Sequence, residues 1–269
     1  MQRVAVLGAG GRMGRMVCQA VASDPGMELV AAVDPEFAGM DVQQVTGVEG
    51  SGLQVGRVID NLLAVGAEVA VDFTVADSAL SNLRWCSANG VHAVVGTTGL
   101  SGPDIDELSA TFKASSANCV IAANFAIGAE LMARFAELAA PFMDGLEIIE
   151  LHHDGKLDAP SGTALHTAQL AAMARARGSD KPFSGDPTTT SLVPGARGGE
   201  GPGSVRLHSV RLPGLVAHQE VIFGAVGQTL TIRHDAYDRT SFMPGVLLAV
   251  RTVPELDGLI AGLGPLLGF

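Results

Sequence analysis

The sequence predicts an α/β fold in two domains, an N-terminal doubly wound parallel sheet and a smaller α+β domain with a mixed sheet. In the first part of the chain, short β-branched strands alternate with amphipathic helical segments, a pattern typical of parallel sheets. Near the end, three strand-like runs follow one another without an intervening helix, which indicates mixed or antiparallel pairing. We expect the first domain to comprise 1–124 with a returning segment 235–269, and the second to comprise 125–234.

The first strand, turn and helix have the features of a Rossmann-type dinucleotide-binding motif. An apolar run over 3–7 leads into Gly8-Ala-Gly-Gly-Arg-Met-Gly14, after which apolar residues recur at helical spacing. Gly8 permits the tight turn, Gly11 lets backbone N–H groups approach a pyrophosphate, and Gly14 allows close packing of helix and strand. The pattern is GxxGxxG, because Met13 stands where the common GxGxxG motif has its last glycine. Taken alone, such a turn also occurs in α/β proteins that bind no phosphate.

An acidic residue follows the second strand, as the dinucleotide-binding motif requires. The strand is expected over 28–33 and ends at Asp34, about twenty residues after the glycine turn. A carboxylate at this place accepts hydrogen bonds from the adenosine ribose hydroxyls and repels a 2′-phosphate. Pro35 stands where an arginine could hold that phosphate, so the sequence favours NADH as the cofactor. Arg12 is a cation in the turn that could compensate, and use of NADPH therefore stays open.

The remaining strands and helices of the first domain follow in alternation. Strands are expected over 68–73, 91–96 and 119–122, and helices over 58–65, 77–89 and 102–115. Outside the short first helix, residues 35–67 are glycine-rich and lack a clear period. Ligands of such sheets bind beyond the carboxyl ends of the strands, so the turns at those ends are candidates for cofactor contacts.

Three short polar turns stand at these strand ends. They are Asp72-Phe-Thr74, Gly96-Thr-Thr-Gly99 and Ala123-Asn-Phe-Ala126. Asp, Thr and Asn also cap helices, and for Thr74 we favour that simpler role. Two hydroxyls between glycines, as in the second turn, favour contacts to the nicotinamide ribose or carboxamide.

The second domain is expected to begin with a helix over 127–143, whose apolar residues form one face. The later elements are a strand over 146–152, a helix over 162–177, a loop over 178–204, strands over 205–212, 215–223 and 228–233, and a helix over 241–252. The long loop is rich in glycine, proline, serine and threonine, and the consecutive strands after it form the mixed sheet.

The densest group of titratable and cationic side chains lies between the strand over 146–152 and the following helix. Its sequence is Glu150-Leu-His-His-Asp-Gly-Lys-Leu-Asp-Ala-Pro-Ser-Gly-Thr163. His152 and His153 point to opposite sides of an extended strand, so both reach one pocket only if the chain turns there. Asp154-Gly155 predicts such a turn, and Lys156 then lies on it. The simplest alternative is a solvated loop with ordinary surface polarity.

The start of the next helix predicts a site for an anionic substrate. Ser161 is a good N-cap, and the N–H groups of Gly162, Thr163 and Ala164 can bind a carboxylate. With Lys156 beside them, these groups form a cationic cradle, and a neighbouring histidine can donate or accept a proton near neutral pH. We expect no metal, because adjacent histidines on a strand diverge and a lysine among the ligands repels a cation.

Composition excludes several classes of partner. The chain of 269 residues has 17 Lys and Arg against 28 Asp and Glu, a formal net charge of −11. This charge argues against binding to nucleic acid or to an anionic membrane surface. No apolar run approaches the roughly 20 residues of a membrane span, and the chain starts with a strand instead of a signal peptide. Three scattered cysteines indicate reduced thiols and therefore a cytoplasmic protein.

Taken together, these motifs resemble the 4-hydroxy-tetrahydrodipicolinate reductase (dihydrodipicolinate reductase) family. The block from Glu150 to Thr163 is highly specific for this family, whereas the glycine turn alone is not. The resemblance covers nearly the whole chain, because the other motifs follow in the family's order. They are the glycine turn, Val71-Asp-Phe-Thr, Val95-Gly-Thr-Thr-Gly and Ala123-Asn-Phe-Ala-Ile-Gly.

The resemblance implies an activity, a set of roles and an assembly. The reaction would be reduction by NADH or NADPH of a dicarboxylate, the dehydrated cyclic imine of 4-hydroxy-tetrahydrodipicolinate, to tetrahydrodipicolinate in lysine and diaminopimelate biosynthesis. His152 would be the proton donor or acceptor and Lys156 the proton donor. The expected substrate contacts are His153, Ser161, Gly162 and Thr163. The expected cofactor contacts are Gly8, Ala9, Gly10, Gly11, Arg12, Met13, Asp34, Gly96, Thr97, Thr98, Ala123, Asn124, Phe125 and Ala126. Members are typically homotetramers built through the sheet of the second domain.

Two departures and two competing functions remain. Many relatives have an arginine at the position of Pro35, which puts NADP preference in doubt, and several have proline at the position of Ala123. One competing function is another two-domain NAD(P) oxidoreductase, such as an amino-acid or homoserine-type dehydrogenase, which would not need the His-His-x-x-Lys block. The other is a redox sensor without enzymatic activity, which would have no use for Lys156 beside an anion-binding helix start.

Overall fold

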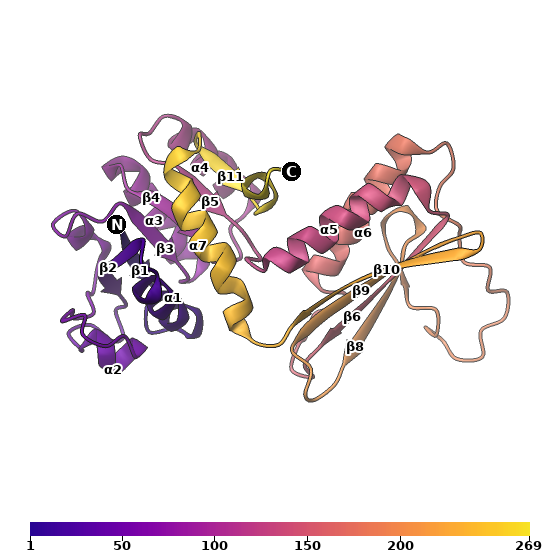
Figure 1. Cartoon of the computed structure of the whole chain (residues 1–269), viewed down its shortest axis with the longest axis horizontal. Coiled ribbons are helices and arrows are strands. Elements are labelled where there is room, and N and C mark those ends of the chain that lie inside the picture. The colour runs from indigo at the N-terminus through magenta and orange to yellow at the C-terminus, as the bar shows by residue number, and fades with distance from the viewer. The chain divides into compact units, whose positions relative to one another are not determined.

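Backbone pairing in the computed structural model, which describes residues 1–269, forms two separate sheets (Figure 1). The first unit comprises Met1–Phe125 with Phe242–Phe269, and the second comprises Ala126–Ser241. All strand pairs of the first sheet are parallel, and the second sheet is mixed, so the predicted fold class is confirmed. None of the helices combines the length and the apolar character that crossing a membrane requires.

The first unit contains a six-stranded sheet in the order β11-β5-β4-β3-β1-β2. Its strands are β1 (Gln2–Leu7), β2 (Met27–Val33), β3 (Val69–Asp72), β4 (His92–Val95), β5 (Cys119–Ile121) and β11 (Leu259–Ala261). Because the strands are parallel, their carboxyl ends lie along one edge of the sheet, where the three predicted polar turns follow β3, β4 and β5.

Helices cover both faces of this sheet. They are α1 (Arg12–Ser23), α3 (Ala76–Asn89), α4 (Gly102–Lys113) and α7 (Met243–Thr252). Side chains alternate along β1, so Val4 and Val6 belong to the apolar cluster with α1 and α7. Ala5 and Leu7 belong to the cluster with α3 and α4. A strand buried on both faces explains the nearly continuous apolar sequence of β1.

The irregular stretch before β3 contains elements that the sequence pattern did not predict. The short helix α2 (Val42–Thr46) starts at Asp41, whose carboxylate accepts a hydrogen bond from the N–H of Gln43. The helix expected over 58–65 is only a 3-10 turn, Ile59–Leu62, in which Leu62 alone is buried. Near the C-terminus, β11 pairs with β5 and forms the edge of the sheet. With three residues, β11 is too short to show an alternating apolar pattern in the sequence.

The second unit contains a five-stranded sheet in the order β10-β9-β6-β8-β7. Its strands are β6 (Gly145–His152), β7 (Gly199–Glu200), β8 (Arg206–Arg211), β9 (Ala217–Ala225) and β10 (Gln228–Ala236). β6 pairs parallel with β8 and antiparallel with β9. The predicted loop over 178–204 is confirmed except for β7 and a 3-10 turn, Pro202–Ser204.

One face of this second sheet carries two helices, α5 (Ile127–Ala139) and α6 (Gly162–Gly178), which lie side by side in Figure 1. Alanines such as Ala136 and Ala168 are fully buried there, and they pack in one cluster with Ile148 and Phe223 of the sheet. α5 ends four residues earlier than predicted and continues as a 3-10 turn that contains Pro141. Proline has no N–H to continue the helical hydrogen bonds.

Candidate functional site

The turn between β1 and α1 has the geometry that a pyrophosphate requires. Gly8 has a positive φ of 76°, and a Cβ added to Gly14 would lie 2.0 Å from the carbonyl oxygen of Gly8. Only glycine therefore lets the helix pack this close to the turn. The N-cap of α1 is Gly11, which makes no side-chain capping bond, so the first N–H groups of the helix are open to an anion. The residues present fit the phosphates of a dinucleotide.

Asp34 lies directly beside this turn at the end of β2. Its side chain is largely buried, and Oδ2 accepts a hydrogen bond of 3.0 Å from the N–H of Gly10. Oδ1 accepts a second bond, of 3.1 Å, from the N–H of Glu36. Arg12, the first residue of α1, is exposed. The turn therefore combines a fixed carboxylate with an exposed cation that no hydrogen bond orients.

A buried carboxylate, Asp72, joins the turns that follow β3 and β4. Its Oδ1 accepts hydrogen bonds from the N–H of Thr74 (2.9 Å), from the Thr74 hydroxyl (2.7 Å) and from the Thr97 hydroxyl (2.9 Å). Its Oδ2 accepts one from the side-chain amide of Asn82 (2.7 Å). The prediction that Thr74 caps the next helix is wrong, because α3 has Val75 as its N-cap and the hydroxyl is held by Asp72.

The turn after β5 is held in place by close backbone packing. The ring of Phe125 is 2% exposed, and its centroid lies 5.9 Å from that of Phe73 in the turn after β3. A Cβ added to Gly245 of α7 would lie 2.0 Å from the carbonyl oxygen of Phe125, so α7 approaches this backbone as only glycine allows. The predicted cofactor residues of the first unit therefore lie on turns at one edge of the sheet, and each turn is fixed by buried contacts.

In the second unit, the chain turns at the end of β6 as the sequence predicts. The strand ends at His152, and the N–H of Lys156 donates a 3.2 Å hydrogen bond to the carbonyl oxygen of His153. The side chain of His152 is 16% exposed, and that of His153 lies at the exposed surface. The turn brings Lys156 close enough to His152 to affect its pKa.

Glu150 organises the buried side of this group. It is fully buried, and its Oε2 accepts a 2.5 Å hydrogen bond from Nδ1 of His152. Arg211 of β8 donates to both carboxylate oxygens, at 2.8 Å each. Burial acts to raise the pKa of Glu150, but hydrogen bonds from Arg211, Ser209 and His152 outweigh it, so the pKa lies below its ordinary value. The carboxylate is therefore ionised at neutral pH.

His152 is correspondingly neutral at neutral pH. Burial lowers its pKa most, the charges of Lys156 and Arg211 act in the same direction, and the contact with Glu150 opposes them without cancelling them. The ring donates through Nδ1, because an ionised carboxylate can only accept. Nε2 of the neutral ring is then an acceptor.

The ammonium group of Lys156 is paired with Asp158 two residues later. Nζ lies 2.8 Å from each carboxylate oxygen of Asp158, whose side chain is 65% exposed. The hydrogen bonds with Lys156 lower the pKa of Asp158. Because Asp158 is largely exposed, this pair contributes little to stability, and another anion can replace Asp158 at small cost.

The start of α6 follows the prediction, with one correction. Ser161 is the N-cap, and its hydroxyl accepts a 3.2 Å hydrogen bond from the N–H of Ala164. That N–H, which we expected to be open to a ligand, is thus occupied. The N–H groups of Gly162 and Thr163 belong to the first turn and have no partner within the helix. Ser161 is 3% exposed, and its own N–H donates to Glu150 at 3.2 Å.

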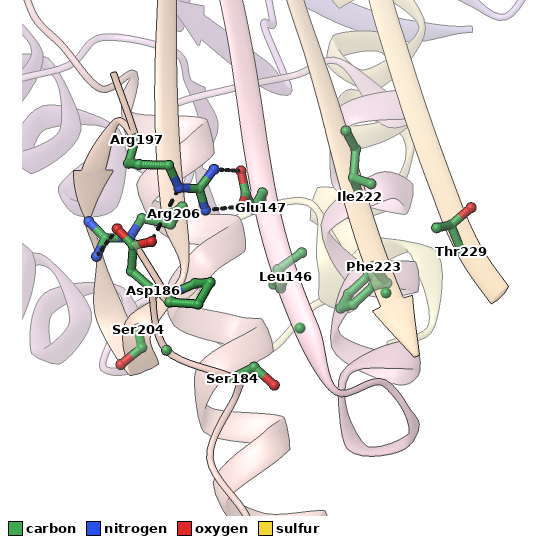
Figure 2. Close-up of a pocket in the computed structure, with 14 residues that line it drawn as sticks. Leu146, Glu147, Ser184, Asp186, Arg197, Ser204, Arg206, Ile222, Phe223 and Thr229 are labelled. Carbon is green, nitrogen blue, oxygen red and sulfur yellow. Dashed lines mark hydrogen bonds and ion pairs between the residues drawn. The ribbon is translucent and has the colours of Figure 1, made fainter. Parts of the chain in front are cut away.

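A hollow of the second unit lies elsewhere (Figure 2). It has a volume of about 500 Å³ and contains an ion pair of 2.5 Å between Arg197 and Glu147. Asp186 and Arg206 also line it, with a 3.2 Å ion pair between them. None of the predicted site residues is among its lining residues. We therefore locate the candidate site by its chemistry, at the end of β6 and the start of α6.

Two residues of this site were not predicted, Glu150 and Arg211. Glu150 lies on the same side of β6 as Leu146 and Ile148, whose side chains are buried. A glutamate in the inward register of a strand, two residues before a histidine, is a signal that the sequence does contain. Arg211 carries no comparable signal, because its pairing opposite His152 depends on the parallel register of β6 and β8.

Comparison with known proteins matches both parts of the chain to one family. Residues 2–125 match the family model described as "Dihydrodipicolinate reductase, N-terminus", and residues 128–263 match "Dihydrodipicolinate reductase, C-terminus". The chain is 50% identical over 266 residues to the 4-hydroxy-tetrahydrodipicolinate reductase of Nocardia farcinica, with 98% of each chain covered. It is 46% identical over 271 residues to the enzyme of the same name from Synechocystis, with 98% of this chain and 97% of the relative covered.

A solved structure gives the same result. The chain is similar to a dipicolinate-bound dihydrodipicolinate reductase from Paenisporosarcina, with a TM-score of 0.86 and 38% identity. The match covers 98% of this chain and 99% of that one. The similarity therefore extends over both units and is not limited to the dinucleotide-binding motif.

Proposed function

Because the chain belongs to the dihydrodipicolinate reductase family throughout its length, we propose how its own residues carry out that family's reaction. The chain is an NAD(P)H-dependent oxidoreductase of lysine and diaminopimelate biosynthesis. It reduces 4-hydroxy-tetrahydrodipicolinate, by way of its dehydrated cyclic imine, to tetrahydrodipicolinate. The observation that carries the proposed roles is the group formed by His152, Lys156 and the open start of α6.

The first unit would hold the cofactor, which when bound supplies a hydride and is oxidised by two electrons to NAD(P)⁺. The turn Gly8–Met13 and the start of α1 bind the pyrophosphate through backbone N–H groups. The turns Gly96–Thr98 and Ala123–Phe125 orient the nicotinamide end, and Ala126 follows them in the chain. This assignment is supported by the fixed geometry of the turns at the carboxyl ends of β1, β4 and β5.

We assign the preference to NADH. The side chain of Asp34 is buried against the glycine turn, where it would accept hydrogen bonds from the ribose hydroxyls and repel a 2′-phosphate. The next residue, Pro35, has no positive charge to bind that phosphate. Arg12 is the cation that would have to compensate, and it is exposed with no hydrogen bond to orient it.

The second unit would bind the dicarboxylate. One carboxylate accepts hydrogen bonds from the N–H groups of Gly162 and Thr163, where the helix start favours negative charge. Ser161 supports this site as the N-cap, and His153 on the exposed turn adds a polar contact. The relative of known structure is bound to dipicolinate, which is an aromatic dicarboxylate, and this supports a dicarboxylate here.

Protonation would fall to Lys156. Reduction adds one hydride and one proton to the conjugated ring, so a group of the protein has to deliver the proton. The ammonium of Lys156 carries three N–H donors, whereas neutral His152 presents Nε2 as an acceptor. We therefore assign the proton donor to Lys156 and assign His152 the role of accepting a proton and passing it on.

The uncovered face of the second sheet is the proposed site of tetramer assembly. Ile149 and Leu151 of β6, Val210 of β8 and Ile222 of β9 lie on the face opposite α5 and α6, and each is only partly buried. Partly exposed apolar side chains on a sheet face that no helix covers support a site of association. Light scattering on Leu151→Arg should show a species smaller than that of the unmodified chain; an unchanged mass would exclude this face.

We also place the chain in the cytoplasm. Its three cysteines are buried and unpaired, and burial raises the pKa of Cys18 and Cys86 to about 12. Such thiols are inert packing residues that need no oxidising compartment.

The activity is tested by following NADH absorbance while the condensation product of aspartate semialdehyde and pyruvate is supplied. We expect turnover with this substrate, and no reduction of NAD⁺ when amino acids or homoserine are supplied with NAD⁺ instead. Reduction of NAD⁺ by those compounds alone would favour another dehydrogenase, and NADH binding without any turnover would favour a sensor.

A further inference from the structure

Glu150 is a buried charge that neither the hydride nor the proton transfer uses directly. The groups that donate to its two oxygens include His152 Nδ1, both terminal nitrogens of Arg211 and the N–H of Ser161. Burying an ion is costly unless its partners are arranged around it. So complete a set of donors, drawn from β6, β8 and the start of α6, indicates a role beyond filling the core.

The contact with His152 determines which ring nitrogen carries the proton. Glu150 Oε2 lies 2.5 Å from Nδ1 and can only accept, so the proton of the neutral ring resides on Nδ1. Nε2 is left with a free lone pair. In the opposite tautomer, Nε2 would carry the hydrogen and could not accept a proton from Lys156 or solvent.

Arg211 links this carboxylate to the turn that carries Lys156. Arg211 lies opposite His152 in the pairing of β6 with β8. One of its terminal nitrogens donates both to Glu150 and, at 2.7 Å, to the carbonyl oxygen of Asp158. The turn has little apolar anchoring, since Leu157 is 99% exposed. Arg211 therefore supplies a contact that holds the Lys156 turn near the buried carboxylate of Glu150.

We propose that Glu150 and Arg211 are positioning residues of the reduction. Glu150 fixes His152 in the tautomer with a free Nε2, and Arg211 holds Glu150 and the Lys156 turn in one arrangement. This inference rests on the proposed roles of His152 and Lys156. It assigns the two residues no contact with substrate or cofactor.

The decisive variant is Glu150→Gln, which keeps the shape and changes the hydrogen bonding. The amide nitrogen of the glutamine can only donate. Where it faces His152, Nδ1 has to be the acceptor, so the ring proton moves to Nε2. We expect ¹⁵N NMR of histidine-labelled enzyme to show this exchange, with the His152 signals identified by their loss in His152→Gln. We expect kcat to fall by about 10²-fold, the scale of a lost acid–base group, with the KM for NADH unchanged.

Two further variants separate positioning from folding. Glu150→Gln with Arg211→Met removes the buried carboxylate together with its partly buried cationic partner. It should therefore recover thermal stability that each single variant loses, while kcat stays low. Glu147→Gln is the matched control, because Glu147 binds Arg197 and His208 on the opposite face of the same strand. It should leave kcat and the His152 tautomer unchanged.

The outcomes distinguish this inference from the proposed function. If His152→Gln and Lys156→Ala lose activity but Glu150→Gln keeps both the Nδ1–H tautomer and kcat, the positioning role is wrong and the proposed function stands. If His152→Gln and Lys156→Ala keep full activity, the roles proposed for these two residues are wrong, and the inference that rests on them fails as well. A double variant that recovers kcat together with stability would show that Glu150 acts only through folding.

Discussion

Replacing Asp72 by asparagine tests whether the cofactor turns are held by one buried carboxylate. Asp72 is 1% exposed and accepts four hydrogen bonds, one of them 2.7 Å from the side-chain amide of Asn82. An asparagine can keep the three bonds to Oδ1, and the amide of Asn82 can turn over to accept from the new amide nitrogen. All four bonds then involve a neutral amide in place of a carboxylate, which costs about 1–3 kcal/mol at a buried site.

The assay combines thermal unfolding with steady-state kinetics. A loss of about 1–3 kcal/mol lowers the thermal midpoint by several degrees in a domain of this size, at about 2–4 °C per kcal/mol. The KM for NADH should rise, because Thr97 loses part of its support. Asn82→Asp should also destabilise the chain, because it places two carboxylates face to face.

Exchanging the two residues provides the control. In Asp72→Asn with Asn82→Asp, the new amide again donates to a carboxylate, so much of the stability and the KM for NADH should return. A single Asp72→Asn variant with an unchanged midpoint, or an exchange no better than the single variants, would refute the reasoning.

Three further predictions concern the cofactor, pH and metals. The kcat/KM with NADH should exceed that with NADPH, because Asp34 is fixed beside the glycine turn and Pro35 offers no cation; the reverse order would mean that Arg12 governs the preference. Protonation of His152, followed by NMR on the unliganded chain, should have its midpoint below the ordinary 6.5, since burial, Lys156 and Arg211 outweigh Glu150. The contribution of neutral His152 to the stability of the folded chain is then present above pH 6.5, and it is lost as the pH falls through the lower pKa of the folded state. A protonation midpoint of His152 above 6.5 would contradict this. A chelator should leave kcat unchanged, because Lys156 repels a cation among the nearby histidines; a loss restored by zinc would require a metal site.

The sequence was sufficient for the features that depend on local chemistry. The alternating strands and helices predicted the parallel sheet, Asp154-Gly155 predicted the turn, and Ser161 was recognisable as an N-cap. Each of these follows from residues that are neighbours in the chain.

Contacts set by tertiary register were beyond such reasoning. Arg211 meets Glu150 across two strands whose pairing joins residues far apart in sequence, and Asn82 reaches Asp72 from the middle of a helix. β11 has three residues, too few to show a period, and gains its place only by pairing with β5. Thr74 satisfied a local capping rule, but Val75 is the N-cap and the Thr74 hydroxyl donates to Asp72.

The central claim is that Lys156 delivers the proton at the start of α6. Its most direct test is kcat of Lys156→Ala with the condensation product and NADH, beside Lys181→Ala, which removes an exposed lysine of the same unit. We expect Lys156→Ala to lower kcat by about 10²-fold or more with an unchanged thermal midpoint, and Lys181→Ala to have no effect. A Lys156→Ala enzyme that turns over at nearly the normal rate would contradict the assignment.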